Sequence, residues 1–181
     1  MKTFTISENE EFSISCSFFD DTHETELSMN VNGDNILAFE RNGSVLTTRW
    51  NLDELAEWLR YFIDHMTEDP YPVEADGEYA AMKDINARDF DSDDEDEFDA
   101  YYDKLDEWNL RHRWHPASSG AILADVYFQL VGDDVEISWN NEDTGDDIKF
   151  LNHLGGTRIN KDIFYTTIDE FLKAYAAHWF S

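Results

Sequence analysis

The sequence predicts an α+β fold with an N-terminal antiparallel meander, about three amphipathic helices and a second β-hairpin near residues 121–140. Before residue 50, apolar and polar residues alternate with a period of two, as in half-buried strands. Elsewhere, apolar residues recur at helical spacing. Because 41% of the 181 residues are hydrophobic and 15% are aromatic, the chain can bury a core. We therefore expect one domain over residues 1–181.

Residues 3–49 predict a meander of four or five strands. Asn32-Gly33 and Asn42-Gly43 are typical of tight hairpin turns, and further strands are expected over residues 35–40 and 45–50. Cys16 is the only cysteine, so it cannot form an internal disulfide and is expected to be a buried small residue. The apolar positions expected on the core face of the second and third strands are Phe12, Ile14, Cys16, Leu27, Met29 and Val31.

A helix is predicted over residues 52–66, with Asn51 as its N-cap and Glu54 in capping-box position. Trp58 lies beside its apolar stripe and is expected to join the core. Pro70 and Pro72 end this region because proline cannot continue a helix.

Two further helices follow the same spacing rule. Residues 95–110 predict a helix with one apolar stripe and an opposite face made almost entirely of carboxylates. Residues 165–180 predict a terminal helix capped by Thr166 or Thr167. Residues 73–90 are ambiguous and read as a loop, with a short helix around residues 78–84 as an option.

Strands are predicted over residues 121–131 and 134–140, joined by a turn at Gly132-Asp133. A short strand is expected at residues 149–151. The pair Gly155-Gly156 after Leu154 is expected to turn the chain.

Charge is the unusual property of this chain. Forty-one acidic residues against thirteen basic ones give a net charge of −28. The segment 89–107 is the densest part, with carboxylates interrupted by one base, Lys104, and by aromatic rings. Direct binding to nucleic acid is disfavoured because phosphates require Lys and Arg, and anionic membranes repel such a chain. The acidity favours a partner with a large positive surface, or reflects only solubility in a salt-rich host.

No constellation of residues predicts catalysis or a cofactor. The acids from Asp91 to Asp99 resemble a calcium loop, but Asp96 replaces its turn glycine and Tyr102 its bidentate glutamate. His112 and His115 are three residues apart, with Asp125 and Glu136 further on, yet a metal needs converging ligands. We expect neither a metal site nor an enzyme, with an enzyme using His112 and His115 as the remaining alternative.

The N-terminus lacks the apolar region of a signal peptide, and no apolar run is long enough to span a membrane. A cytoplasmic protein is expected.

Several motifs between residues 45 and 140 resemble a known domain. They include Trp50, Trp58-Leu59, Pro70-x-Pro72, Trp114-His115-Pro116-Ala117 and, most clearly, the segment from Asp125 to Trp139. Together they resemble an uncharacterised bacterial domain found N-terminal to IrrE-type zinc metallopeptidase domains. The HExxH motif of the peptidase is absent, so the resemblance implies a binding module without peptidase activity.

The preferred functional hypothesis is a non-enzymatic acidic protein that inhibits a basic partner, most simply an immunity protein that neutralises a nuclease toxin. The expected partner-binding residues are Asp91, Asp93, Asp94, Glu95, Asp96, Glu97, Asp99, Tyr101, Tyr102 and Asp103.

The alternative is a DNA mimic that inhibits a defence protein or a DNA-binding protein. A mimic needs carboxylates spaced like the phosphates of one strand, about 7 Å apart, taken as twice the rise per nucleotide. The sequence leaves the identity of the partner and the oligomeric state open.

Overall fold

A computed structural model describes residues 2–6, 9–18, 24–64, 69–114, 124–141 and 147–179. Side chains are described within these ranges except for residues 2–6, 18, 24, 178 and 179. His115, the expected loop after it and the start of the predicted strand 121–131 lie outside the described residues.

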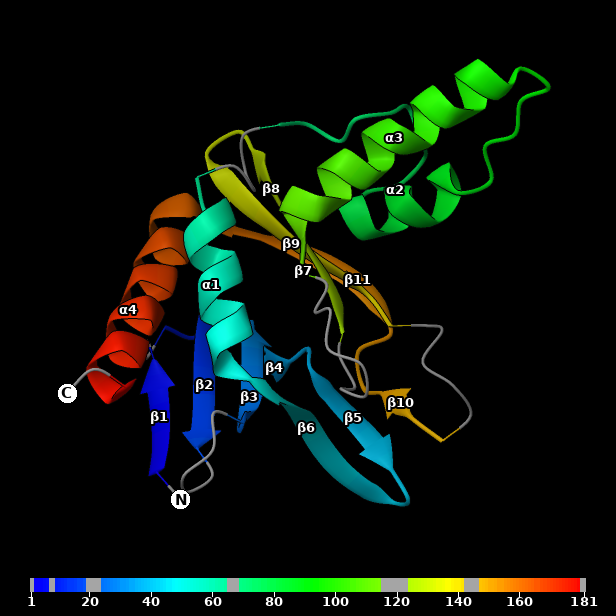
Figure 1. The fold of residues 1–181 in the computed structure, drawn as a ribbon. Helices are drawn as coiled ribbons and strands as arrows, with labels where there is room; N and C mark the ends of the chain where they lie inside the picture. The colour runs from blue at the N-terminus through cyan, green and yellow to red at the C-terminus, as the bar shows by residue number, and fades with distance from the viewer. Residues whose placement is uncertain are drawn as a thin grey trace.

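The fold is α+β, as predicted, and its described elements form two antiparallel sheets and four helices (Figure 1). The first sheet has the order β1-β2-β3-β6-β5-β10, with β4 paired to β3, and the second has the order β11-β9-β8-β7. The strands of the first sheet are β1 (Lys2–Ile6), β2 (Phe12–Phe18), β3 (Glu24–Val31), β4 (Asp34–Asn35), β5 (Ala38–Arg41), β6 (Ser44–Asn51) and β10 (Lys149–Phe150). Those of the second are β7 (Arg113–Trp114), β8 (Asp125–Val131), β9 (Asp134–Asn140) and β11 (Leu154–Asn160). The helices are α1 (Leu52–Phe62), α2 (Ala80–Ala87), α3 (Glu95–His112) and α4 (Lys161–Trp179).

The hairpin turns follow the predicted chemistry. Asn32 and Asn42 adopt positive φ angles of 52° and 53°, and the glycine after each is also at positive φ. Two successive central residues at positive φ define a type I′ turn, whose twist matches the right-handed twist of the two strands that it joins. The predicted strand over residues 35–40 is instead divided into β4 and β5, because the buried Ile36 and Leu37 leave the ladder between them.

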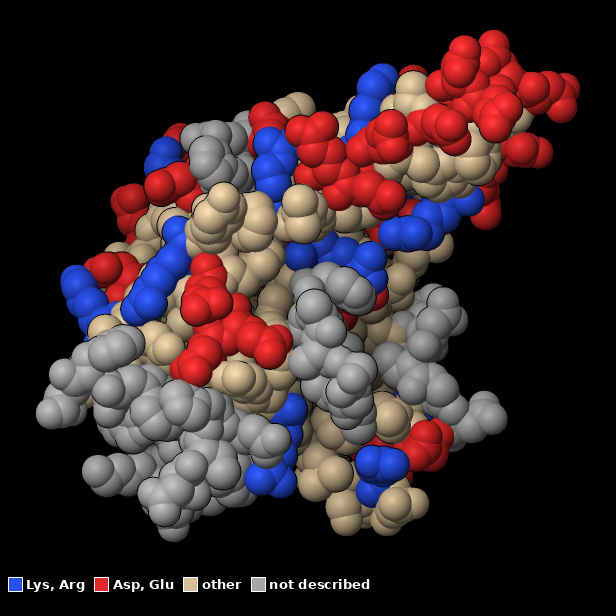
Figure 2. Space-filling model, in the orientation of Figure 1, with Lys and Arg blue, Asp and Glu red and all other residues tan. Residues whose placement is uncertain are grey.

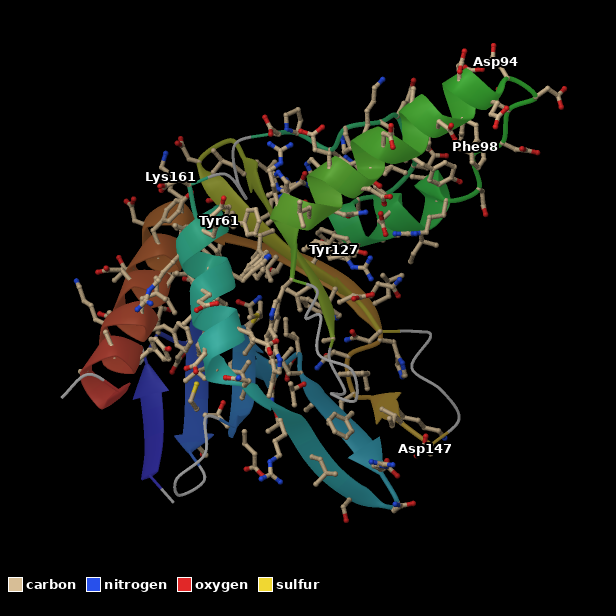
Figure 3. The ribbon with its side chains drawn as sticks, in the orientation of Figure 1. Tyr61, Asp94, Phe98, Tyr127, Asp147 and Lys161 are labelled. Atoms are coloured by element: carbon tan, nitrogen blue, oxygen red, sulfur yellow. The ribbon has the colours of Figure 1, made fainter. Side chains whose placement is uncertain are left out.

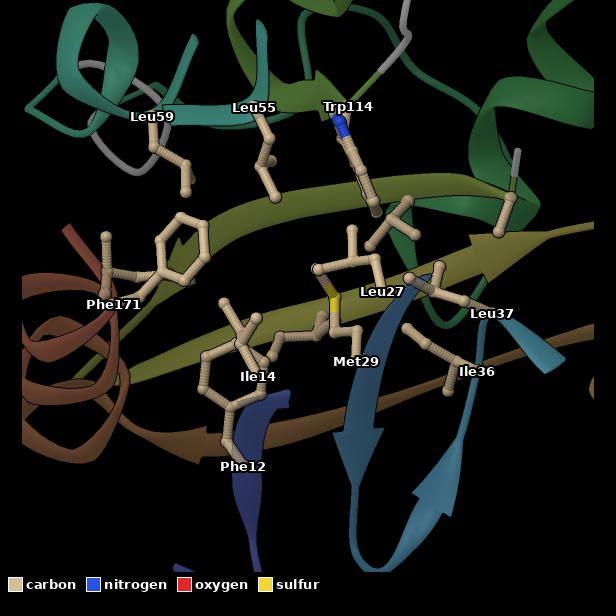
Figure 4. Close-up of a cluster of buried hydrophobic side chains, with 14 of the residues drawn as sticks. Phe12, Ile14, Leu27, Met29, Ile36, Leu37, Leu55, Leu59, Trp114 and Phe171 are labelled. Carbon is tan, nitrogen blue, oxygen red and sulfur yellow. The ribbon is translucent and has the colours of Figure 1, made fainter. Parts of the chain in front are cut away.

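The core lies between the two sheets and is closed by α1 and α4 (Figure 4). All six positions expected to face it from β2 and β3 are buried. Leu55 and Leu59 of α1, Trp114 of β7 and Phe171 of α4 meet them there, and Trp58 packs against the same cluster. Burial raises the pKa of Cys16 to about 12, so its thiol stays protonated.

Asn51 caps α1 as predicted, because its Oδ1 accepts a hydrogen bond of 2.9 Å from the Asp53 N–H. Glu54 does not complete a capping box; its carboxylate accepts from Trp50 Nε1 at 3.1 Å.

The predicted cap of α4 is wrong. The helix begins at Lys161, four residues earlier than expected, and Asn160 Oδ1 accepts from the Asp162 N–H at 2.9 Å. Thr167 therefore lies inside the helix, where it is buried and its hydroxyl donates to the carbonyl of Phe12 at 3.5 Å.

The predicted turn at Gly155-Gly156 is also wrong, since both residues lie within strand β11. Aromatic rings pack onto these positions and explain the glycines. A Cβ on Gly156 would meet Cγ of Tyr79 at 2.5 Å, and a Cβ on Gly155 would meet Trp139 at 2.9 Å.

The second sheet is covered on its other face by α2, and α3 runs beside α2 (Figure 1). No helix among the described residues is long and apolar enough to cross a membrane.

Candidate partner-binding surface

The acidic segment (residues 89–107) lies on α3 and on the loop that leads into it. The C-terminal half of α3 is anchored to the body through its buried residues Leu105, Trp108, Asn109 and His112. In the N-terminal half, none of residues 95–104 is buried. Figure 1 shows that this N-terminal half projects beyond the second sheet. The segment is therefore a protruding element with an anchored base.

All eleven carboxylates of the acidic segment are exposed. Figure 2 shows acidic side chains gathered over the projecting end of α3. Among the ion pairs of the described residues, one involves this set: Glu107 lies 3.9 Å from Arg111. The eleven residues are Asp89, Asp91, Asp93, Asp94, Glu95, Asp96, Glu97, Asp99, Asp103, Asp106 and Glu107.

Two of these acids also shape the start of α3. Asp94 is the N-cap, and its Oδ1 accepts from the Glu97 N–H at 3.2 Å. The Glu97 carboxylate accepts from the Ser92 hydroxyl at 2.7 Å, which ties the loop to the first turn. Acidic side chains in this turn also interact favourably with the helix dipole. Asp94 and Glu97 thus have a structural role besides any role in binding.

The aromatic residues of the segment hold the loop against the helix. Phe90 stacks on Tyr101 with ring centroids 3.9 Å apart. The Tyr102 hydroxyl donates to the carbonyls of Arg88 at 2.9 Å and Phe90 at 3.1 Å. Burial, together with the neighbouring Tyr102, raises the pKa of Tyr101. Tyr101 and Tyr102, which were expected to contact a partner, are half-buried and hold this loop against the helix. Any contact with a partner would use their exposed edges.

A buried carboxylate on α2 joins α2, α3 and the second sheet. Asp84 is 3% exposed and accepts from Tyr127 Oη at 2.9 Å, from Asn109 Nδ2 at 3.0 Å and from the guanidinium of Arg88 at 3.0 Å. Burial and the charge of Asp84 raise the pKa of Tyr127 far above its usual range. This network fixes the base from which α3 projects.

A second buried carboxylate holds the other end of α2. Glu136 of β9 is 1% exposed, and its Oε1 accepts from the Ala80 N–H at 2.7 Å and from Gln129 Nε2 at 2.9 Å. Next to it, the Ser138 hydroxyl accepts from the Ala81 N–H at 3.1 Å. The first N–H groups of a helix have no partner within the helix, so these strand side chains satisfy them.

The predicted binding residues all fall within one continuous stretch, from the loop before α3 through its first three turns (Figure 3). Sequence reasoning placed Phe98 and Leu110 on the apolar stripe of the predicted helix and not among the binding residues, but their side chains are 37% and 65% exposed. It also gave no role to Asp84, because a single acid in a short ambiguous segment carries no pattern.

Three of the residues considered for a metal, His112, Asp125 and Glu136, do not gather, and the fourth, His115, lies outside the described residues. His112 is buried at the end of α3, stacked on Trp108, with its Nδ1 2.8 Å from the carbonyl oxygen of Phe128. Asp125 pairs with Arg113, and Glu136 caps α2. Within the part of the chain that the structure describes, no three His, Cys, Asp or Glu side chains could hold a metal ion together.

No protein-family model, curated protein or solved structure matches this chain. The resemblance to the domain that precedes IrrE-type metallopeptidases therefore stays a prediction.

Proposed function

We propose that this protein is a cytoplasmic, non-enzymatic binding protein that inhibits a basic partner, and that the partner is a nuclease toxin. The single observation that carries the proposal is the exposure of all eleven carboxylates of the acidic segment. One of them, Glu107, forms an ion pair with Arg111. Their charge is available to a molecule outside the chain.

This arrangement costs the fold stability. Glu95, Asp99 and Asp103 follow one another at four-residue intervals on α3, so each neighbouring pair repels. Like charges at this spacing destabilise a helix by roughly 0.2–0.5 kcal/mol per pair. A positively charged surface on a partner would offset that repulsion. This favours a role in binding over an acidity that serves only solubility.

A nuclease fits such a surface because its active site must attract phosphates with Lys and Arg. A protruding row of carboxylates can enter a positive cleft and exclude the substrate. Complementary charge also accelerates association, which suits an inhibitor that must act before its toxin does.

The experiment is capture of partners from the lysate of the host with the tagged protein, at low and at high salt, followed by mass spectrometry. One basic protein that salt releases, and whose nuclease activity the tagged protein suppresses, is the expected result. Absence of any salt-sensitive partner would leave the acidity as a solvated surface.

Spacing along α3 favours the DNA mimic as a second candidate. Residues four apart rise about 6 Å along a helix, given about 1.5 Å per residue. Glu95, Asp99 and Asp103 therefore repeat near the spacing of about 7 Å expected of a mimic. Displacement of duplex DNA from several unrelated DNA-binding proteins would support this candidate, whereas inhibition of one nuclease alone supports the immunity protein.

A further inference from the structure

Four aromatic rings form a cluster at the projecting end of α3, away from the core. They are joined in series: Phe90 stacks on Tyr101, Tyr101 contacts Tyr102 at 5.5 Å, and Tyr102 contacts Phe98 at 4.7 Å between centroids. Neither of the two buried clusters of the described residues includes any of these rings. Hydrophobic core packing therefore does not account for them.

Three of the rings have a local structural role, and the fourth does not. The stacked pair Phe90 and Tyr101 and the hydroxyl of Tyr102 hold the loop to the helix. Phe98 adds no hydrogen bond and remains 37% exposed, on the side of α3 that Figure 3 shows turned toward this loop. Its exposed ring stands within the densest group of carboxylates on the molecule.

We infer that Phe98 and Tyr102 form a stacking surface for arginine side chains of the partner, with the neighbouring carboxylates pairing the same guanidinium groups. This inference rests on the proposed function and narrows the partner to one that presents arginine rather than lysine at the contact. A guanidinium is planar and weakly hydrated, so it stacks on a ring while its N–H groups bind a carboxylate, whereas an ammonium is a compact, strongly hydrated charge.

The protein uses the same combination within its own fold. The guanidinium of Arg113 lies over the ring of Tyr127, 5.6 Å from its centroid, while its Nη2 contacts Asp125 Oδ2 at 2.5 Å. Arg60 lies over the ring of Tyr175 at 5.2 Å, a second guanidinium on a ring, although the carboxylate of Asp53 there accepts from the Tyr175 hydroxyl. At the end of α3, Phe98 and the carboxylates are exposed and Tyr102 is half-buried, and the arginine would come from outside.

The test measures binding of fluorescent oligoarginine and oligolysine peptides of equal length by anisotropy, at matched low salt. The wild-type protein should bind oligoarginine about two- to fivefold more tightly than oligolysine, the range that an exposed cation–π contact supports. Phe98→Ala and Phe98→Leu should both bring this ratio close to one and leave the affinity for oligolysine unchanged. Leu110→Ala, at the other end of the same helix, is the matched control and should keep the ratio.

The outcomes separate the inference from the function on which it rests. A ratio that survives both Phe98 substitutions, in variants whose circular dichroism matches the wild type, overturns the stacking surface while the acidic binding surface stands. If Phe98→Ala abolishes the preference for oligoarginine but Phe98→Leu keeps it, the preference comes from apolar contact and not from stacking. That result also overturns the stacking surface. Failure of both peptides to bind the wild-type protein overturns the proposed function together with the inference.

Discussion

The carboxylate of Glu136 accepts a hydrogen bond of 2.7 Å from the backbone N–H of Ala80, which lies 56 positions earlier in the chain. The same oxygen accepts from Gln129. Through this contact the inner strand β9 holds the start of α2, and α2 in turn holds α3 through Asp84 and Asn109. The projecting carboxylates thus depend on a buried one for their position.

Glu136→Ala should lower the free energy of unfolding by about 2–3 kcal/mol, because it leaves the buried Ala80 N–H and the Gln129 amide without their acceptor. Glu136→Gln retains an oxygen acceptor and should cost less. Urea denaturation measures both. Glu78→Ala, at an exposed acid two residues before Ala80, is the control. A midpoint for Glu136→Ala equal to that of this control would contradict the role of Glu136.

The hydroxyl of Tyr127 gives a test of the Asp84 network. Tyr127→Phe removes one buried hydrogen bond to a charged acceptor and should destabilise the protein by about 1.5–3 kcal/mol. Tyr61→Phe removes the same atom from a side chain that is 77% exposed and should have no measurable effect. Equal unfolding midpoints for the two variants would show that the network does not stabilise α2.

Burial of Cys16 predicts a dependence of stability on alkaline pH. Its pKa is raised from 9.0 to about 12, so the folded state disfavours the thiolate. The stabilisation is fully present below the ordinary value of 9.0 and is lost as the pH rises toward 12. Between these values the wild-type protein should lose more stability than Cys16→Ala, as measured by denaturation at a series of pH values. Parallel curves for the two proteins would contradict this.

Even a single methyl group added at Gly156 should lower the stability of the fold. Gly156→Ala places a Cβ against the ring of Tyr79 and should cost about 1–3 kcal/mol. The same substitution in a Tyr79→Ala background should cost clearly less, because the main obstacle is gone, and the double-mutant cycle gives the coupling. Additive effects would show that the close approach of Tyr79 is not the reason for the glycine.

Local patterns predicted the elements whose cause is local. Alternation identified β2 and β3, helical spacing identified α1 and α3, and Asn-Gly pairs identified two turns. Residues 95–110 were also predicted as a helix with carboxylates on one face, because both the periodicity and the charge are visible in sequence.

Errors arose where distant residues decide the structure. Gly155 and Gly156 resemble a turn, yet they lie in a strand because Trp139 and Tyr79 pack onto them. Glu136 and Asp84 resemble ordinary surface acids, and only the pairing of α2 with the second sheet gives them buried partners. No spacing rule predicts a contact between positions 80 and 136.

The measurement that tests the central claim most directly compares two variants for binding to the captured basic partner over a range of salt concentrations. One variant carries six neutral substitutions in the acidic segment, and it retains Asp94 and Glu97 because they shape the helix start. The other carries six at exposed acids elsewhere, so the total charge of both is equal. The acidic-segment set is Asp91→Asn, Asp93→Asn, Glu95→Gln, Asp96→Asn, Asp99→Asn and Asp103→Asn. The control set is Glu10→Gln, Asp34→Asn, Glu57→Gln, Asp64→Asn, Glu74→Gln and Glu170→Gln.

If the acidic segment is the binding surface, the first variant should bind at least about tenfold more weakly and with a flatter salt dependence, and the second should bind nearly as the wild type does. Equal loss in both variants would show that only net charge matters, and it would contradict a binding site on α3.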